Sequence, residues 1–233
     1  MYGICNLCGK YKYLIKKSHI ISKFLFRDLF KMRAKKSILE VDLENINKFK
    51  TPSDTLYDSN LFCEVCDKEL MGSYENYYAK YINKNKFKVI SGEIEKHVYT
   101  NYDYVKFILF FNIQLFRACL SNRKDFQNVK LEQNFIEFIR LNIYNKSILT
   151  KTNDIVLLKL SDKSNYKDII GSFIEINNNY VVIFRNFIVF YFFNSNDELY
   201  NLLKCHIITE NHVIVPVINK YNEINIIKPL LGI

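Results

Sequence analysis

Four cysteines of this chain fall into two pairs with the spacing of metal ligands. Cys5 and Cys8 form one C-x-x-C pair, and Cys63 and Cys66 form the other. In this spacing a tight turn directs two thiolates at one ion, and two such turns complete the four sulfur ligands of a closed structural zinc site. Glycines on both sides of the first pair permit such a turn. The sequence therefore predicts one bound Zn²⁺ with all four cysteines as ligands.

A histidine that the zinc does not need lies between the two pairs. His19 sits in a run of β-branched and aromatic residues that predicts a short strand. Histidine titrates near neutral pH, so it can act as a general base. The alternative to a catalytic role is that His19 is a structural residue, hydrogen-bonded in the core or at the surface. The remaining histidines, His97, His206 and His212, have no partner pattern and are expected to be structural.

Length and composition predict a folded, soluble protein. The chain has 233 residues, of which 49% are hydrophobic, enough for one large domain or two small ones. The N-terminal segment lacks the apolar stretch of a signal peptide, and the apolar run 107–116 is too short to cross a bilayer. We therefore expect a cytoplasmic protein without membrane contact. Cys119 and Cys205 lie in apolar segments, where reduced, buried thiols are expected.

The positive charge is unevenly distributed. The formal net charge of +9 divides into +5 for residues 1–95, +4 for 96–150 and zero for 151–233. Ser22 can begin a helix with a basic side, and the candidate phosphate contacts in and before that helix are Lys16, Lys17, Lys23, Arg27, Lys31 and Arg33. The alternative for this helix is a solvated surface. Charge and zinc together predict a nucleic-acid partner, which can be DNA or RNA. Double-stranded DNA is the form that we expect.

The remaining segments change from helical to strand patterns along the chain. Residues 37–59 are polar and are expected to form a loop or a poorly ordered insertion. A helix is expected from Cys66, with a stripe of four tyrosines (Tyr74, Tyr77, Tyr78 and Tyr81) that favours core packing over base stacking. Two more helices are expected at 103–121, buried on most sides, and at 130–144. Strands are expected at 155–160, 169–176, 180–184, 187–193, 213–217 and 224–227, with a short helix after residue 195 or 196.

The order of these motifs resembles the HNH (ββα-metal) endonucleases, in the branch that two C-x-x-C pairs staple through a zinc ion. The resemblance covers roughly residues 1–80. It rests on the first cysteine pair, the segment His19-Ile20-Ile21, Asn60 just before the second pair, and Asp67 directly after it. By resemblance, His19 is the general base, Asn60 orients the motif, and Asp67 is a ligand of a catalytic Mg²⁺ or Mn²⁺.

The position before the histidine carries a metal ligand in that family, and here it is Ser18. Because a hydroxyl is a poorer ligand than a carboxylate, Glu64, Glu69 and Glu75 are further candidates for the catalytic metal. For Asp67, the alternative is an acid that complements the helix dipole. For Asn60, it is a residue that forms a turn.

The expected architecture is α+β. It comprises a zinc-stapled ββα-metal, treble-clef-like finger (1–95), a helical middle segment (96–150) and a C-terminal antiparallel sheet (151–233) of unknown role. The predicted function is a metal-dependent endonuclease that hydrolyses phosphodiester bonds. The resemblance associates it with mobile elements or phage defence. The neutral charge of the C-terminal part suggests a scaffold, an oligomerisation surface or a sensor, and a second copy or a defence partner would bind there. The alternative is a non-catalytic zinc finger that binds nucleic acid or a protein.

Overall fold

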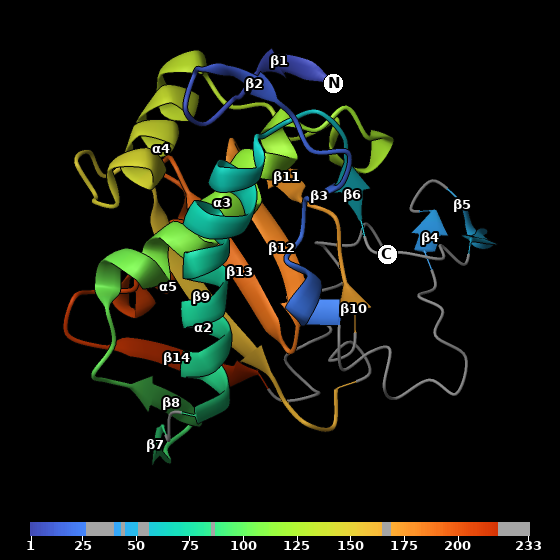
Figure 1. Ribbon diagram of the computed structural model, residues 1–233. Coiled ribbons are helices and arrows are strands. Elements are labelled where there is room, and N and C mark those ends of the chain that lie inside the picture. Colours follow the sequence, from blue (N-terminus) through green and yellow to red (C-terminus); the bar gives the residue numbers. More distant parts are fainter. Residues whose placement is uncertain (27–39, 43–44, 51–55, 85–86, 165–168, 219–233) are drawn as a thin grey trace.

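The computed structural model describes residues 1–26, 40–42, 45–50, 56–84, 87–164 and 169–218 (Figure 1). Its strands are β1 (Tyr2–Ile4), β2 (Tyr11–Tyr13), β3 (Ser18–His19), β4 (Glu40–Asp42), β5 (Asn45–Lys50), β6 (Tyr57–Asp58), β7 (Lys88–Ile90), β8 (Lys96–Tyr99), β9 (Asp154–Leu160), β10 (Ile169–Ile170), β11 (Ile174–Ile176), β12 (Asn179–Arg185), β13 (Phe187–Phe192) and β14 (Val213–Ile218). Its helices are η1 (Val65–Met71), α2 (Gly72–Lys84), α3 (Tyr104–Leu120), η2 (Lys124–Phe126), α4 (Gln133–Asn145), α5 (Glu198–Leu203) and η3 (Lys204–His206).

The main sheet has the strand order β10-β12-β13-β9-β14-β8-β7, and β11 also pairs with β12. Its pairs are antiparallel except β14 with β9, which run parallel. The predicted antiparallel sheet is thus confirmed for most pairs, but it extends beyond residues 151–233. The hairpin β7–β8 joins it through β14, and the boundary expected at residue 95 falls inside that hairpin. The strand expected at 224–227 lies outside the described residues.

Two strand predictions are corrected. Residues 37–59, expected as a loop, contain β4, β5 and β6. Strand pairing is made by backbone groups, so a polar composition does not prevent it. The strand expected at 169–176 is divided into β10 and β11, which both pair with β12.

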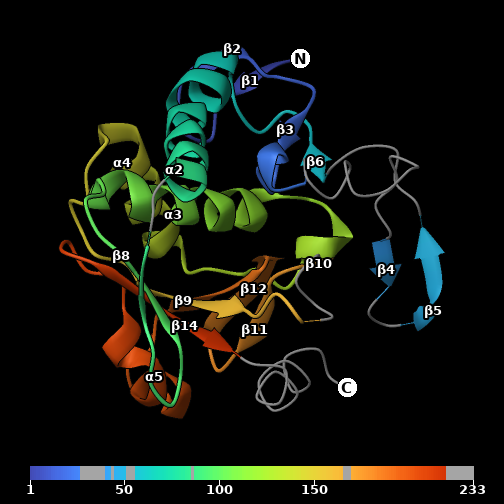
Figure 2. The same cartoon turned by 90° about the horizontal axis from the view of Figure 1, so that it is seen from below.

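The helices and the main sheet form layers, with α3 in the interior. Figure 2 shows α2, then α3, then the sheet, with α5 on the far side of the sheet. Asp103 caps α3 by accepting a hydrogen bond from the Lys106 amide at 3.0 Å. Residues 107–118 of α3 are all buried. The prediction of a helix enclosed on most sides is confirmed.

Alternation along β13 places its side chains in two hydrophobic clusters. Val189 and Tyr191 belong to the cluster on the α3 side, and Ile188 and Phe190 to the cluster on the α5 side. The first cluster continues from Cys5 through α2 and α3 to β14, so the three segments expected as units share one core.

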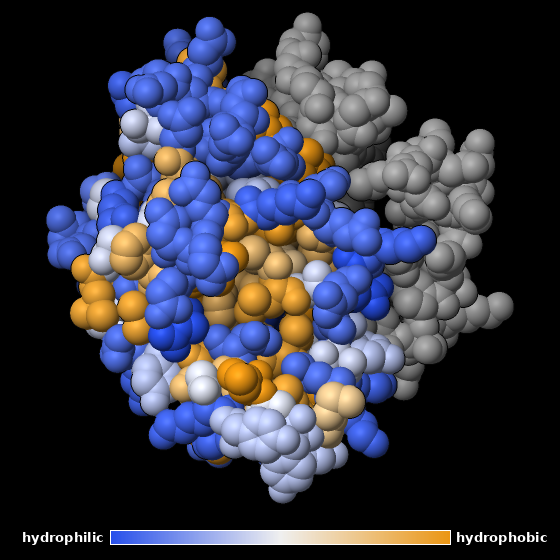
Figure 3. All heavy atoms as spheres, turned by 90° about the horizontal axis from the view of Figure 1, so that it is seen from above, coloured by the Kyte–Doolittle hydropathy of each residue, from blue (hydrophilic) through white to orange (hydrophobic). Residues whose placement is uncertain are grey.

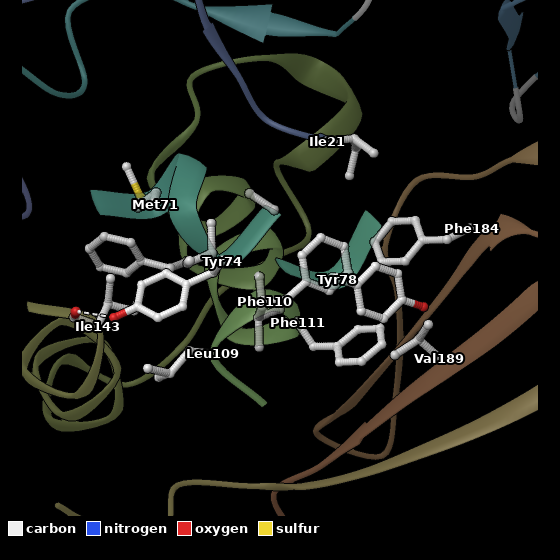
Figure 4. Packing of buried hydrophobic residues seen from close by; sticks show 14 of the residues in the cluster. Ile21, Met71, Tyr74, Tyr78, Leu109, Phe110, Phe111, Ile143, Phe184 and Val189 are labelled. Atoms are coloured by element: carbon white, nitrogen blue, oxygen red, sulfur yellow. Dashed lines mark hydrogen bonds between the residues drawn. The ribbon is translucent and has the colours of Figure 1, made fainter. Parts of the chain in front are cut away.

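The tyrosine stripe of α2 faces this core, as predicted. Tyr78 stacks on Phe110 at a ring-centroid distance of 3.9 Å, between α3 and the sheet residues Phe184 and Val189 (Figure 4). Tyr74, Tyr78 and Tyr81 are buried, and Tyr77 is half-buried. The stripe therefore contributes to packing.

Candidate metal centre and the adjoining polar cluster

The first cysteine pair lies in the turn between β1 and β2. The Gly9 amide donates to the Cys5 carbonyl at 2.9 Å, and the Cys5 amide donates to the Lys10 carbonyl at 3.0 Å. Gly9 has a φ of +68°, a left-handed conformation that favours glycine. This turn brings the Cys5 and Cys8 side chains to one side of the loop.

The second pair is positioned by the start of a helix. Cys63 forms an isolated bridge with Leu14, and Cys66 lies in the first turn of η1. The four Sγ atoms lie within 4.8 Å of one another, and none forms a disulfide. A tetrahedral ion with metal–sulfur bonds of about 2.3 Å needs sulfurs about 3.8 Å apart. The four cysteines therefore fit a single structural metal ion, consistent with Zn²⁺.

The thiols cannot all ionise without a cation. A hydrogen bond from the Cys66 thiol lowers the pKa of Cys5 to about 4. The pKa of Cys66 is raised far above its ordinary value, chiefly by that same bond and then by burial. Burial also raises the pKa of Cys63. One thiolate thus disfavours ionisation of Cys63 and Cys66, whereas a bound divalent ion would favour the thiolate form of its ligands.

The predicted histidine lies on β3, and the predicted asparagine lies three residues before Cys63. His19 is half-buried on β3 and pairs with Tyr57 of β6. The Asn60 amide donates to the Ile15 carbonyl at 2.9 Å, so Asn60 lies beside the chain that enters β3. Asn60 has a φ of +61°, a conformation that asparagine tolerates better than most residues. This backbone role accounts for the asparagine without catalysis.

The predicted metal ligand Asp67 is bound by two side chains. The Ser18 hydroxyl donates to Asp67 Oδ1 at 2.5 Å, and Arg117 of α3 donates to the same oxygen at 3.1 Å. Ser18 and Asp67 occupy the two positions at which the HNH resemblance places metal ligands. The fold therefore brings these positions together, but with a guanidinium beside them.

The predicted candidate Glu75 belongs to the same cluster. Arg117 donates to Glu75 Oε1, and the Ser22 hydroxyl donates to that oxygen at 2.9 Å. Gln114 in turn donates to the Ser22 hydroxyl at 2.8 Å. The hydroxyl of Ser22, a residue expected to cap a helix, joins α2 to α3 in this cluster. We call Ser18, Ser22, Asp67, Glu75, Gln114 and Arg117 the arginine cluster.

Arg117 is the centre of the arginine cluster. Its side chain is 2% exposed, compared with 11% for Asp67 and 21% for Glu75. Burial alone would lower the pKa of Arg117, but the attraction of Glu75 and Asp67 outweighs it and raises the pKa above its ordinary value. The guanidinium therefore stays charged and neutralises one of the two carboxylates.

The arginine cluster does not fit a divalent cation. Both carboxylates already bind a fixed positive charge, and a second cation beside Arg117 would be repelled. The other two candidates, Glu64 and Glu69, are exposed, and Glu64 forms an ion pair with Lys68 at 2.6 Å. Within the described ranges, the four cysteines are the only group of three or more His, Cys, Asp or Glu side chains placed to hold a metal ion.

Three of the six predicted basic residues belong to the part of the chain that the structure describes, and all three are exposed. Lys16, Lys17 and Lys23 are exposed, and Lys17 Nζ lies 4.5 Å from the centre of the Tyr57 ring. The helix expected after Ser22 is present at residues 23–26. Arg27, Lys31 and Arg33 lie outside the described residues.

Arg117 was not among the candidate site residues predicted from the sequence. The available signal was three polar residues, Asn112, Gln114 and Arg117, in the otherwise apolar stretch 107–118. A buried polar group needs a partner, and such residues therefore point to a polar cluster. The expectation of buried thiols is corrected for Cys205, which is exposed in η3, and Cys119 is half-buried.

Comparisons of the chain with protein-family models, with curated proteins and with solved structures gave no match. In the part of the chain that is described, no helix combines the length and apolar character needed to span a bilayer.

Proposed function

We propose that this chain is a zinc-stapled, HNH-like nucleic-acid-binding protein in which Arg117 fills the place of the catalytic cation. Zn²⁺ bound by the four cysteines fixes the β1–β2 turn against the start of η1, in a treble-clef-like arrangement. The protein binds nucleic acid without metal-dependent cleavage at Asp67.

The observation that carries this proposal is the arginine cluster. Asp67 would have to exchange Arg117 and Ser18 for a cation in order to act as a ligand. Because Arg117 is almost completely buried, that exchange would break a desolvated ion pair, which typically costs about 3–5 kcal/mol. A permanently bound guanidinium supplies the positive charge that holds the carboxylates together but cannot activate water as a metal ion does.

The charge distribution supports a nucleic-acid partner. Residues 1–26 contain five lysines and no aspartate or glutamate. A bound Zn²⁺ with four thiolates carries a formal charge of about −2, which leaves this segment positive. Phosphate contacts by such lysines give binding that weakens steeply with salt.

The second candidate is the predicted HNH endonuclease. The antiparallel pairing of β3 with β6 followed by the helix η1–α2 supports it, because this is the ββα order that the resemblance implies. In this candidate His19 is the general base, and Mg²⁺ or Mn²⁺ would need ligands other than those of the arginine cluster. A role in phage defence, with a partner bound through the sheet region, belongs to the same candidate.

One experiment separates the two functions. The purified zinc-loaded protein is incubated with duplex DNA, single-stranded DNA and RNA, with Mg²⁺, Mn²⁺ or EDTA, and both binding and cleavage are measured beside His19→Ala. We expect salt-dependent binding by both proteins and no cleavage by either. Cleavage that requires the metal ion and disappears in His19→Ala, with zinc content unchanged, would establish the nuclease instead.

A further inference from the structure

The β1–β2 hairpin exposes three tyrosine rings on one face. Tyr2 is 65% exposed, Tyr11 71% and Tyr13 52%. Tyr2 lies opposite Tyr13 in the strand register, and Tyr11 lies opposite Ile4, which is also exposed. Residues opposite each other, or two apart along a strand, share a face. We call Tyr2, Tyr11 and Tyr13 the tyrosine face.

The tyrosine face is not needed for the core. The hairpin packs through its other side, where a side chain at Gly3 would lie only 2.9 Å from Leu14 Cδ1. The rings contact one another instead: Tyr2 stacks on Tyr11 at 6.1 Å between centroids, and it meets Tyr13 edge-on at 5.6 Å. In α2, by contrast, Tyr74, Tyr78 and Tyr81 are buried in the core. Three adjacent exposed rings therefore call for a ligand.

The hairpin is also held rigidly. Its turn contains Cys5 and Cys8, and the Leu14 amide donates to the Met1 carbonyl at 2.8 Å. A bound metal ion would tie this turn to the second cysteine pair. The rings are thus presented on a fixed support, which lowers the entropy lost on binding.

The charge around the tyrosine face indicates what kind of ligand it binds. Lys10 and Lys16 are exposed near the two ends of β2, in a segment that has no acidic residue. Figure 3 views the molecule from the side on which Figure 1 places the hairpin, and much of the surface there is hydrophilic. A polyanion that also offers flat apolar surfaces matches both features.

We infer that the tyrosine face stacks on unpaired bases of a single-stranded nucleic acid while the neighbouring lysines bind its phosphates. Base stacking on aromatic side chains, combined with a positive surface along the backbone, is how proteins bind single strands without sequence preference. In a duplex the base faces are occupied by their neighbours, so the tyrosines could contribute little. This inference rests on the proposed nucleic-acid binding and adds the form of nucleic acid that is bound.

The test compares a fluorescently labelled oligothymidylate with a labelled mixed-sequence duplex of equal length, by anisotropy titration with the zinc-loaded protein. The variants are Tyr11→Ala and Tyr11→Phe, with Tyr144→Ala as the matched control, since Tyr144 is an exposed tyrosine (40%) on α4. Zinc content and melting temperature are measured for each protein.

We expect the wild type to prefer the single strand. Tyr11→Ala should weaken single-strand binding by roughly five- to hundredfold and leave duplex binding unchanged, because one stacking contact is lost. Tyr11→Phe and Tyr144→Ala should bind like the wild type. If the protein binds nucleic acid but Tyr11→Ala has no effect on the single strand, the inference is wrong and the proposed function stands. If the wild type binds neither probe at low salt, both fail.

Discussion

Replacing Arg117 by methionine should strongly destabilise the protein. Methionine has a similar length but no charge, so Arg117→Met leaves Asp67 and Glu75 near each other with no compensating cation. Removing one partner of a buried ion pair typically costs about 3–5 kcal/mol of unfolding free energy. Arg117 is 2% exposed, which favours the upper half of this range, whereas the partial exposure of the two carboxylates favours the lower half. We therefore expect a loss of about 3–5 kcal/mol.

The assay is urea unfolding of the zinc-loaded protein followed by circular dichroism. The matched control is Arg123→Met, because Arg123 forms an ion pair with Asp125 at 2.8 Å but the two side chains are 30% and 25% exposed. Such a pair contributes about 0–1 kcal/mol. A second variant should recover stability: Arg117→Met combined with Asp67→Asn and Glu75→Gln removes the unpaired charges. If Arg117→Met costs no more than Arg123→Met, the guanidinium does not hold the cluster together and the argument fails.

Three further outcomes test the rest of the structure. Cys66→Ser should lose the bound zinc and several kcal/mol of stability in metal analysis and melting experiments, whereas Cys205→Ser, outside the cysteine cluster, should lose neither. Burial lowers the pKa of His97, and the hydrogen bond to Glu95 offsets part of this effect. Protonation of His97 therefore favours the unfolded chain. The free energy of unfolding should fall between about pH 7 and pH 5, and it should fall less in His97→Gln. A Phe110→Ala variant should cost about 3–5 kcal/mol in thermal unfolding, because the residue is completely buried between α2 and the sheet. An equal cost for an alanine at a fully exposed position would contradict this packing.

Local patterns predicted the cysteine cluster and most of the elements. Each C-x-x-C pair is set by a single turn, so its geometry is encoded in a few neighbouring residues. The apolar surroundings of α3 likewise follow from its own sequence. These features need no knowledge of distant contacts.

The arginine cluster could not be predicted in the same way. Asp67 and Arg117 are far apart in the sequence, and they meet only because α3 packs against α2. An aspartate at position 67 can bind either a metal ion or an arginine, so its residue type does not show which partner it has. The strands within 37–59 were not predicted from the sequence either. These strands form through backbone pairing with a partner strand, and their polar composition does not indicate that pairing.

The central claim is that Arg117 takes the place of a divalent cation beside Asp67. An electron paramagnetic resonance titration of the zinc-loaded wild type with Mn²⁺, beside Asp67→Asn, tests it directly. We expect the two proteins to bind the same amount of Mn²⁺, because Asp67 is held by Arg117 and Ser18. A tight Mn²⁺ site in the wild type that Asp67→Asn removes would contradict the account and restore the metal-dependent nuclease.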